Sequence, residues 1–278
     1  MSGGGSSDAA IAMIGGGQMA LALADGFCRA GLVTPAAITV YDPHPEARAR
    51  FAGRVPGVRF AASGAEAAAA AAVVVLAVKP QQAAAACREI AASLSPSTLL
   101  VSIVAGLSTA SLSALTGVAR VIRVMPNTPC LVGKGVSAVC HTPAVSADAL
   151  ARVVGLLASV GAVHEVDESL LDAVTGVSGS GPGYVAMFVE ALTDGGVRAG
   201  LPEPLALALA VETLGGTAAL LEQTGEHPAT IRERVCSPGG TTLAGLAAME
   251  QAGVRAGIAA GVVAARDRAR ELGRPQGS

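Results

Sequence analysis

From residue 10 to about residue 166, the chain alternates short runs of β-branched residues with alanine-rich stretches, and this alternation limits its possible folds more than any other feature. The pattern is typical of βαβ units on a parallel sheet with helices on both faces. The expected strands are residues 10–14, 38–41, 73–78, 99–103, 121–124, 136–140 and 163–166. We therefore predict an α/β domain over residues 1–167.

Strand signals end near Ser169, and the remaining sequence predicts helices only. The expected helices are residues 182–198, 204–223, 228–235, 242–251 and 253–271, in a second domain over residues 168–278. The helix at 204–223 has leucines and alanines all round, so it must be buried on every side. A domain of about 100 residues has little room for it. We expect a partner subunit to cover it, with burial inside its own domain as the alternative.

A glycine-rich turn follows the first expected strand. Residues Gly15, Gly16, Gly17, Gln18, Met19 and Ala20 match the pattern GxGxxA. The first glycine allows the tight turn, the second lets a pyrophosphate approach, and the alanine lets the helix pack closely on the strand. Placed between a strand and a helix, the motif predicts a dinucleotide site, with an ordinary βα turn as the alternative.

The second expected strand ends at Asp42, where a carboxylate could accept hydrogen bonds from the ribose hydroxyls of NADH. Asp42 would also repel the 2′-phosphate of NADPH and so favours NADH. The nearby His44, Arg48 and Arg50 could instead hold that phosphate, so both cofactors stay open. A third loop contains Ala77, Val78 and Lys79. The chain has only two lysines against 17 arginines, which suggests that Lys79 serves the ligand, although a solvated loop lysine is the alternative.

A second glycine-rich turn lies near the C-terminus. Cys236, Ser237, Pro238, Gly239, Gly240, Thr241 and Thr242 lead into a helical pattern that begins at Leu243. Two glycines allow a concave turn, and the free N–H groups of the helix start suit a carboxylate. The predicted ligand is a small acidic metabolite that Thr242 could contact on its other side. The alternative is that Ser237 and Thr241 only cap the helix.

Composition argues against several other classes of protein. A net charge of −2 and six aromatic residues offer neither a basic groove nor a stacking platform for nucleic acid. The longest apolar run, residues 67–78, is shorter than the roughly 20 residues of a bilayer span, and residues 1–10 lack the features of a signal peptide. Five cysteines form no C-x-x-C pair, so we expect no metal site or disulfide. We expect a soluble, cytoplasmic protein.

Taken in order, the motifs resemble the pyrroline-5-carboxylate reductase family, the enzymes of the last step of proline biosynthesis. The matching segments are IGGGQMA (14–20), LAVKPQ (76–81), VIRVMPNTP (121–129), DAVTGVSGSGPGY (172–184) and VCSPGGTTLAGL (235–246). They extend over most of the chain, and the last two are specific to this family.

This resemblance implies an N-terminal Rossmann domain and a C-terminal all-helical dimerisation domain. The implied reaction is the reduction of 1-pyrroline-5-carboxylate to L-proline by NADPH or NADH, in dimers that are often assembled further into decamers. The implied cofactor positions are Ile14, Gly15, Gly16, Gly17, Gln18, Met19, Asp42, Ala77, Val78, Lys79, Val104 and Ala105, and the implied substrate positions are Ser237, Gly239, Gly240, Thr241 and Thr242.

Thr242 is the candidate catalytic residue, expected to hydrogen-bond the ring nitrogen of the substrate. Because a neutral threonine is a poor acid, we expect the proton to come from water or to be present already on the substrate. Two rival functions remain at this point. A β-hydroxyacid dehydrogenase would need a catalytic lysine in its second half, yet no lysine follows Lys134. A non-catalytic dinucleotide-binding sensor or scaffold would use the late glycine turn only as a helix cap.

Overall fold

The computed structural model describes residues 10–273 of the 278-residue chain. The chain divides into two compact units. The first consists of the chain up to Gly179 together with the residues from Ala265 onward, and the second is Ser180–Ala264. The division falls later in the chain than the predicted boundary at 167/168.

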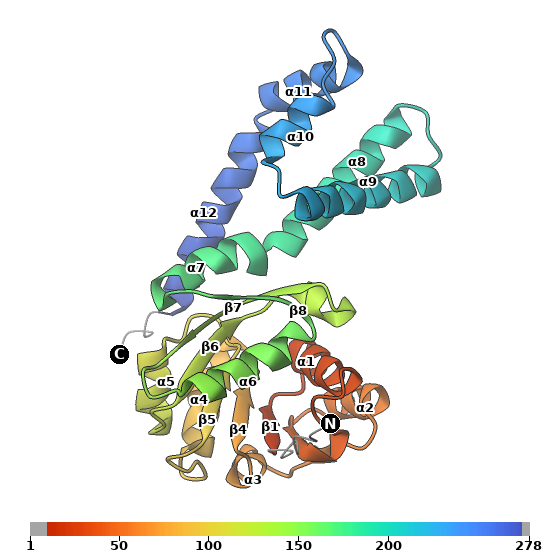
Figure 1. Cartoon of the computed structure of the whole chain (residues 1–278). Helices are drawn as coiled ribbons and strands as arrows, with labels where there is room; N and C mark the ends of the chain where they lie inside the picture. The colour runs from red at the N-terminus through yellow and green to blue at the C-terminus, as the bar shows by residue number, and fades with distance from the viewer. Residues whose placement is uncertain (1–9, 274–278) are drawn as a thin grey trace, which may run out of the picture. The chain divides into compact units, whose positions relative to one another are not determined.

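The first unit is built on an eight-stranded sheet with the order β3-β2-β1-β4-β5-β6-β7-β8 (Figure 1). The strands are β1 (Ile11–Ile14), β2 (Ile38–Tyr41), β3 (Arg59–Phe60), β4 (Val73–Leu76), β5 (Leu99–Ser102), β6 (Val121–Met125), β7 (Gly135–His141) and β8 (Gly161–Glu165). Strands β1 to β6 are parallel to one another. This is the strand order of a dinucleotide-binding Rossmann sheet, so the predicted α/β fold is confirmed.

Three details of the sheet differ from the prediction. Strand β3 was missed because it is only two exposed residues at the edge of the sheet. Strand β7 runs antiparallel to β6 rather than parallel, and β8 is parallel to β7. The third expected strand also ends earlier, at Leu76 rather than at Val78.

Helices cover both faces of the sheet. They are α1 (Gln18–Arg29), α2 (Pro45–Arg54), α3 (Gly64–Ala69), α4 (Pro80–Ala91), α5 (Thr109–Thr116) and α6 (Ala147–Ala158). Helices α1, α2 and α6 share one apolar core with the sheet, and α3, α4 and α5 share the other. Short elements complete the unit: η1 (Pro35–Ala37), η2 (Thr128–Val132), η3 (Glu168–Leu170), α7 (Leu171–Val174) and the π-helical turn η4 (Thr175–Gly179).

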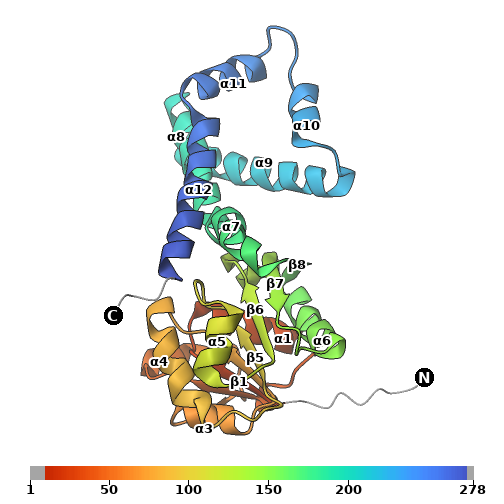
Figure 2. The ribbon, with the colours of Figure 1, turned by 90° about the vertical axis from the view of Figure 1, so that its left-hand side faces the viewer.

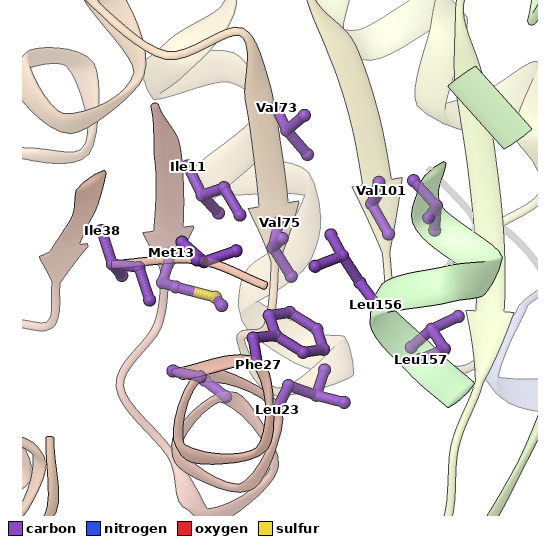
Figure 3. Packing of buried hydrophobic residues seen from close by; sticks show 14 of the residues in the cluster. Ile11, Met13, Leu23, Phe27, Ile38, Val73, Val75, Val101, Leu156 and Leu157 are labelled. Carbon is purple, nitrogen blue, oxygen red and sulfur yellow. The ribbon is translucent and has the colours of Figure 1, made fainter. Parts of the chain in front are cut away.

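Strand β1 shows how the two cores arise. Because successive side chains of a strand point to opposite faces, Ile11 and Met13 enter one core while Ala12 and Ile14 enter the other. In the first core, Leu23 and Phe27 of α1 and Leu156 and Leu157 of α6 pack on the valines of β4 and β5 (Figure 3). The buried apolar runs of β1 and β4 are therefore explained by helices on both sides.

The second unit contains helices and no strand (Figure 2). Its helices are α8 (Gly181–Arg198), α9 (Glu203–Thr224), α10 (Pro228–Arg234), α11 (Thr241–Gln251) and the first part of α12 (Val254–Leu272). Together with the Rossmann sheet, this confirms the predicted two-part architecture.

Helix α9 is nearly uncovered in the single chain. Only Ala206 and Ala210 are buried, whereas the large apolar residues Leu205, Leu207, Leu209 and Val211 are 45–52% exposed. The structure therefore excludes burial of α9 inside its own chain. By length and composition, α9 is also the one helix among residues 10–273 that could cross a membrane, with a mean hydropathy of 1.6. Such an apolar surface marks an interaction site.

Candidate active site

A cleft of about 540 Å³ lies at the carboxyl ends of β1, β2 and β4. Ligands of open α/β sheets bind at this position, where the chain switches from building the sheet on one side of β1 to building it on the other. Seven of the twelve predicted cofactor residues line the cleft: Ile14, Gly15, Gly17, Asp42, Ala77, Val78 and Lys79. The cleft is thus the candidate dinucleotide site.

The glycine turn forms the floor of the cleft. Gly15 has a φ of +101°, and a Cβ there would lie 2.7 Å from the carbonyl oxygen of Ala77, so only glycine fits. At Gly17, no atom lies within 4 Å of the Cβ position, which leaves the backbone open to a ligand. Gly17 is also the N-cap of α1, and no side chain caps this helix. The first N–H groups of α1 are therefore free for a phosphate.

Asp42 is fastened to this turn. Its Oδ2 accepts a hydrogen bond of 2.8 Å from the backbone N–H of Gly16, and its Oδ1 lies 2.9 Å from both the backbone N and the ring Nδ1 of His44. Burial of the side chain opposes ionisation, but the N–H donors of His44 and Gly16 outweigh it and lower the pKa of Asp42. The carboxylate is thus an ionised part of the turn, and most of its hydrogen-bonding capacity is already used.

Among the basic residues near Asp42, two have different roles. Arg48 donates a hydrogen bond of 2.9 Å to the backbone carbonyl oxygen of Asp42 and so stabilises the start of α2. Arg50 lines the cleft and, within the part of the chain that the structure describes, makes no hydrogen bond or ion pair. Arg50 therefore offers an uncommitted guanidinium to a ligand, and Lys79, at the N-cap of α4, adds a second cation.

The other predicted cofactor residues lie beside the cleft rather than in its lining. Gly16 is buried behind it, Gln18 is exposed, and Met19 packs partly against the core. Val104 and Ala105 follow β5 at the same edge of the sheet, one strand beyond β4. Because the side chain of Val104 is buried, only its backbone could face a cofactor.

The cleft also contains residues that the sequence analysis did not identify. Glu46 lies in the first turn of α2, and Gln82 and Ala86 lie on α4. Both helices begin directly after a loop at the carboxyl edge of the sheet. In a βαβ pattern, the helices that follow these loops begin beside the ligand site, so the sequence could have identified these residues from the positions of the helix starts.

The second predicted site lies in the helical unit, at the start of α11. The N–H of Gly240 donates to the carbonyl oxygen of Ser237 over 2.9 Å and closes a turn in which Gly239 has a φ of +68°. Helix α11 begins at Thr241 with Gly240 as its N-cap, and no side chain caps it. The structure therefore does not support the capping alternative. The N–H groups of Thr241 and Thr242 belong to the first turn, where helices lack internal partners.

Three hydroxyl groups surround this uncapped helix start. Ser237 and Thr241 are exposed, Thr242 is half-buried, and none of the three side chains makes a hydrogen bond within residues 10–273. A Cβ on Gly240 would lie 2.3 Å from Oγ of Ser237, so glycine is needed for the serine to fold over the turn. The turn thus combines free N–H groups with free hydroxyls, which is a suitable environment for a carboxylate.

The fold and the cleft define a Rossmann-type NAD(P)-dependent oxidoreductase with a separate helical domain. Residues 10–106 match the family model described as NADP oxidoreductase, coenzyme F420-dependent, and residues 168–272 match the model for pyrroline-5-carboxylate reductase dimerisation. The chain belongs to the pyrroline-5-carboxylate reductase family, and it is an NAD(P)H-dependent enzyme of proline biosynthesis. This excludes the sensor and scaffold alternatives.

Relatives and solved structures agree over nearly the whole chain. The pyrroline-5-carboxylate reductase of Synechocystis sp. is 44% identical over 264 residues, which are 95% of this chain and 98% of the relative. The enzyme of Arabidopsis thaliana is 40% identical over 94% of this chain and 95% of its own length. The crystal structure of the Plasmodium falciparum enzyme with NADP bound superposes with a TM-score of 0.89 at 31% identity, covering 97% of this chain and 100% of the other.

Proposed function

We propose that the enzyme uses NADPH in preference to NADH and that Arg50 binds the 2′-phosphate. The residues of the cleft fit this cofactor: the backbone at Gly17 is open, the start of α1 is uncapped, and Arg50 is an uncommitted cation. Guanidinium groups are well suited to phosphate because they donate in a planar fork. Asp42 is already bonded to Gly16 and His44, so it is a weak selector for the ribose of NADH. NADP in the Plasmodium structure supports the same choice.

The substrate carboxylate is held by the turn from Ser237 to Thr242. The uncapped start of α11 is the single observation that carries this proposal, because its N–H groups and three hydroxyls have no partners in the described chain. Gly240 contributes differently: its own N–H is used to close the turn, so it shapes the site rather than binding the anion. Gly239 supplies the left-handed residue that the turn requires.

Thr242 orients the substrate ring. Its hydroxyl is half-buried beside the anion site and can hydrogen-bond the ring nitrogen while the carboxylate is held by the neighbouring N–H groups. The bound NADPH supplies the hydride that reduces the imine carbon. Because Thr242 is a poor acid, the ring nitrogen receives its proton from water or carries it before binding. The protein therefore accelerates the reaction mainly by positioning.

The exposed apolar surface of α9 is the core of a homodimer interface in this proposal. The match to the dimerisation model covers residues 168–272, and large apolar interfaces are typical of permanent dimers. A protein interface, rather than a membrane, then covers α9. We propose that the functional domains divide at 167/168 and that dimers assemble further into decamers. We also propose that the enzyme is cytoplasmic, because its five cysteines are all free thiols.

The test is a comparison of steady-state kinetics with the two cofactors. Purified enzyme is mixed with 1-pyrroline-5-carboxylate and either NADPH or NADH, and the loss of reduced-nicotinamide absorbance is followed. We expect L-proline as the product and a kcat/KM for NADPH about tenfold or more above that for NADH. A higher kcat/KM for NADH would overturn the proposed role of Arg50.

A further inference from the structure

Asn127 is the only asparagine in the chain, and its side chain connects three segments. It follows β6 and is the N-cap residue of η2, yet its side chain makes no capping hydrogen bond to that helix. Its Oδ1 accepts a hydrogen bond of 2.8 Å from the backbone N–H of Val136, at the start of β7, and its Nδ2 donates one of 3.1 Å to the carbonyl oxygen of Ser178. With only 8% of the residue exposed, both ends of this buried amide are satisfied.

Ser178 belongs to the π-helical turn η4. Such turns are uncommon and frequently occur at functional sites. The hydroxyl of Thr175 donates to Leu171 and that of Ser178 donates to Val174, so both hydroxyls serve the local backbone. Gly179 closes the turn, and a Cβ there would lie 2.5 Å from the terminal methyl group of Met125. The turn therefore lies directly against the last residue of β6.

This junction lies at the edge of the sheet where the cofactor cleft opens. Strand β6 is parallel to β5, so Met125 and Asn127 lie at the carboxyl edge of the sheet, the edge on which the cofactor cleft opens. The π-helical turn ends at Gly179, and the helical unit begins at Ser180. Asn127 thus binds the last turn before the helices that carry the Ser237–Thr242 turn.

We propose that Asn127 is a positioning residue for hydride transfer. By holding the carbonyl group of Ser178, it fixes the π-helical turn as the point from which the helical unit leaves the Rossmann domain. This inference rests on the proposed binding of the substrate by the Ser237–Thr242 turn, because the position of the departing helices then sets how the substrate meets the cofactor. Misplacement of the reactants by about 1 Å can cost on the order of a hundredfold in rate.

Two variants of Asn127 test the proposal. Asn127→Asp keeps an acceptor for Val136 but loses the donor to Ser178, and the uncharged Asn127→Ser is too short to span to Ser178. We expect both to lower kcat and raise KM for 1-pyrroline-5-carboxylate, with kcat/KM reduced about tenfold or more. The dissociation constant for NADPH should stay within about twofold of the wild-type value. Amide hydrogen exchange over residues 175–180 should become faster in both variants.

Ser178→Ala is the matched control, since it removes only the bond to Val174 and keeps the carbonyl group that Asn127 contacts. Faster exchange with unchanged kcat/KM would assign Asn127 a purely structural role and overturn the proposal, as would an equal loss of NADPH affinity. The Asn127→Ser variant keeps the test decisive if the charge of Asn127→Asp prevents folding.

The substrate assignment is checked in parallel with Thr242→Ala. If that variant loses activity while the Asn127 variants do not, only the positioning role fails; if Thr242→Ala keeps wild-type KM and kcat, the substrate site itself is wrong.

Discussion

The backbone N–H of Gly16 donates a hydrogen bond of 2.8 Å to Oδ2 of Asp42 and thereby joins the glycine turn after β1 to the end of β2. The acidic residue at this position usually suggests a ligand for the ribose of NADH. Here the same carboxylate also receives two donors from His44, so it holds the floor of the cleft in place. In the sequence, Asp42 could serve either the stability of the turn or the choice of cofactor. The structure shows that its carboxylate bonds to the turn.

Asp42→Asn will lower the free energy of unfolding by about 1–2 kcal/mol at neutral pH, because one amide oxygen replaces two acceptor oxygens. The folded-state pKa of Asp42 lies below that of the unfolded chain. Its contribution is therefore present above the unfolded pKa, near 4, and is lost as the pH falls through the lower folded pKa. Urea unfolding at neutral pH and near pH 3 should show the difference between variant and wild type shrinking in acid.

Asp167→Asn is the control for this charge change, because Asp167 is exposed and its side chain caps no helix. This variant should unfold like the wild type at both pH values. A destabilisation by Asp42→Asn that is equal at neutral and acidic pH would contradict the assignment, because it would show that ionised Asp42 contributes nothing to folding.

Arg50→Ala will weaken NADPH binding about tenfold, equivalent to roughly 1.4 kcal/mol, while NADH binding stays within about twofold. The reason is that the guanidinium of Arg50 faces the cleft without another partner in the described chain. Fluorescence titration with each cofactor measures the two dissociation constants. Arg152→Ala, an exposed arginine on α6, is the matched control. Equal weakening of both cofactors would show that Arg50 contacts the shared part of the dinucleotide.

The α/β fold and the location of the cleft at the carboxyl ends of the strands could be predicted because buried valine and isoleucine runs alternate with helical stretches. The direction of β7 was also readable in principle. Only residues 126–134 separate β6 from β7, whereas a parallel return needs a crossover of a dozen or more residues. Strand β3 carried no usable signal, because two exposed residues cannot show an alternating pattern.

Spacing in the sequence pointed to segments that line the cleft, but not to the role of each side chain. His44, Arg48 and Arg50 all follow Asp42, and the sequence does not say which of them remains free. In the structure, Arg48 donates a hydrogen bond to the carbonyl group of Asp42, whereas Arg50 has no hydrogen bond or ion pair among residues 10–273. Similarly, whether Ser237 caps α11 depends on the closure of its turn by Gly240.

Thr242→Ala will lower turnover about tenfold or more, equivalent to roughly 1.4 kcal/mol, and leave NADPH binding intact. The variant removes the hydroxyl that orients the ring nitrogen but keeps the backbone N–H groups of the α11 start. Steady-state kinetics with varied 1-pyrroline-5-carboxylate provide the measurement. Thr242→Ser retains the hydroxyl and should recover most of the activity.

Thr230→Ala serves as the control for Thr242, since Thr230 is an exposed threonine of α10 with no side-chain hydrogen bond in the described chain. Its kinetics should equal those of the wild type. Full activity of Thr242→Ala would remove this residue from the mechanism and leave the carboxylate site as the only contribution of the turn.

Leu209→Glu will dissociate the dimer. Leu209 is 45% exposed in the single chain, and a carboxylate placed in an apolar interface loses its hydration without gaining a partner. Light scattering over a range of protein concentrations should show a mass that falls toward the 27.1 kDa of one chain, with circular dichroism reporting whether the separated chain stays folded. Leu32→Glu, at a leucine of the first unit that is 47% exposed, should leave the mass unchanged. If Leu209→Glu kept the wild-type mass while remaining folded, this face of α9 would lie outside the interface, and another surface would have to hold the subunits together.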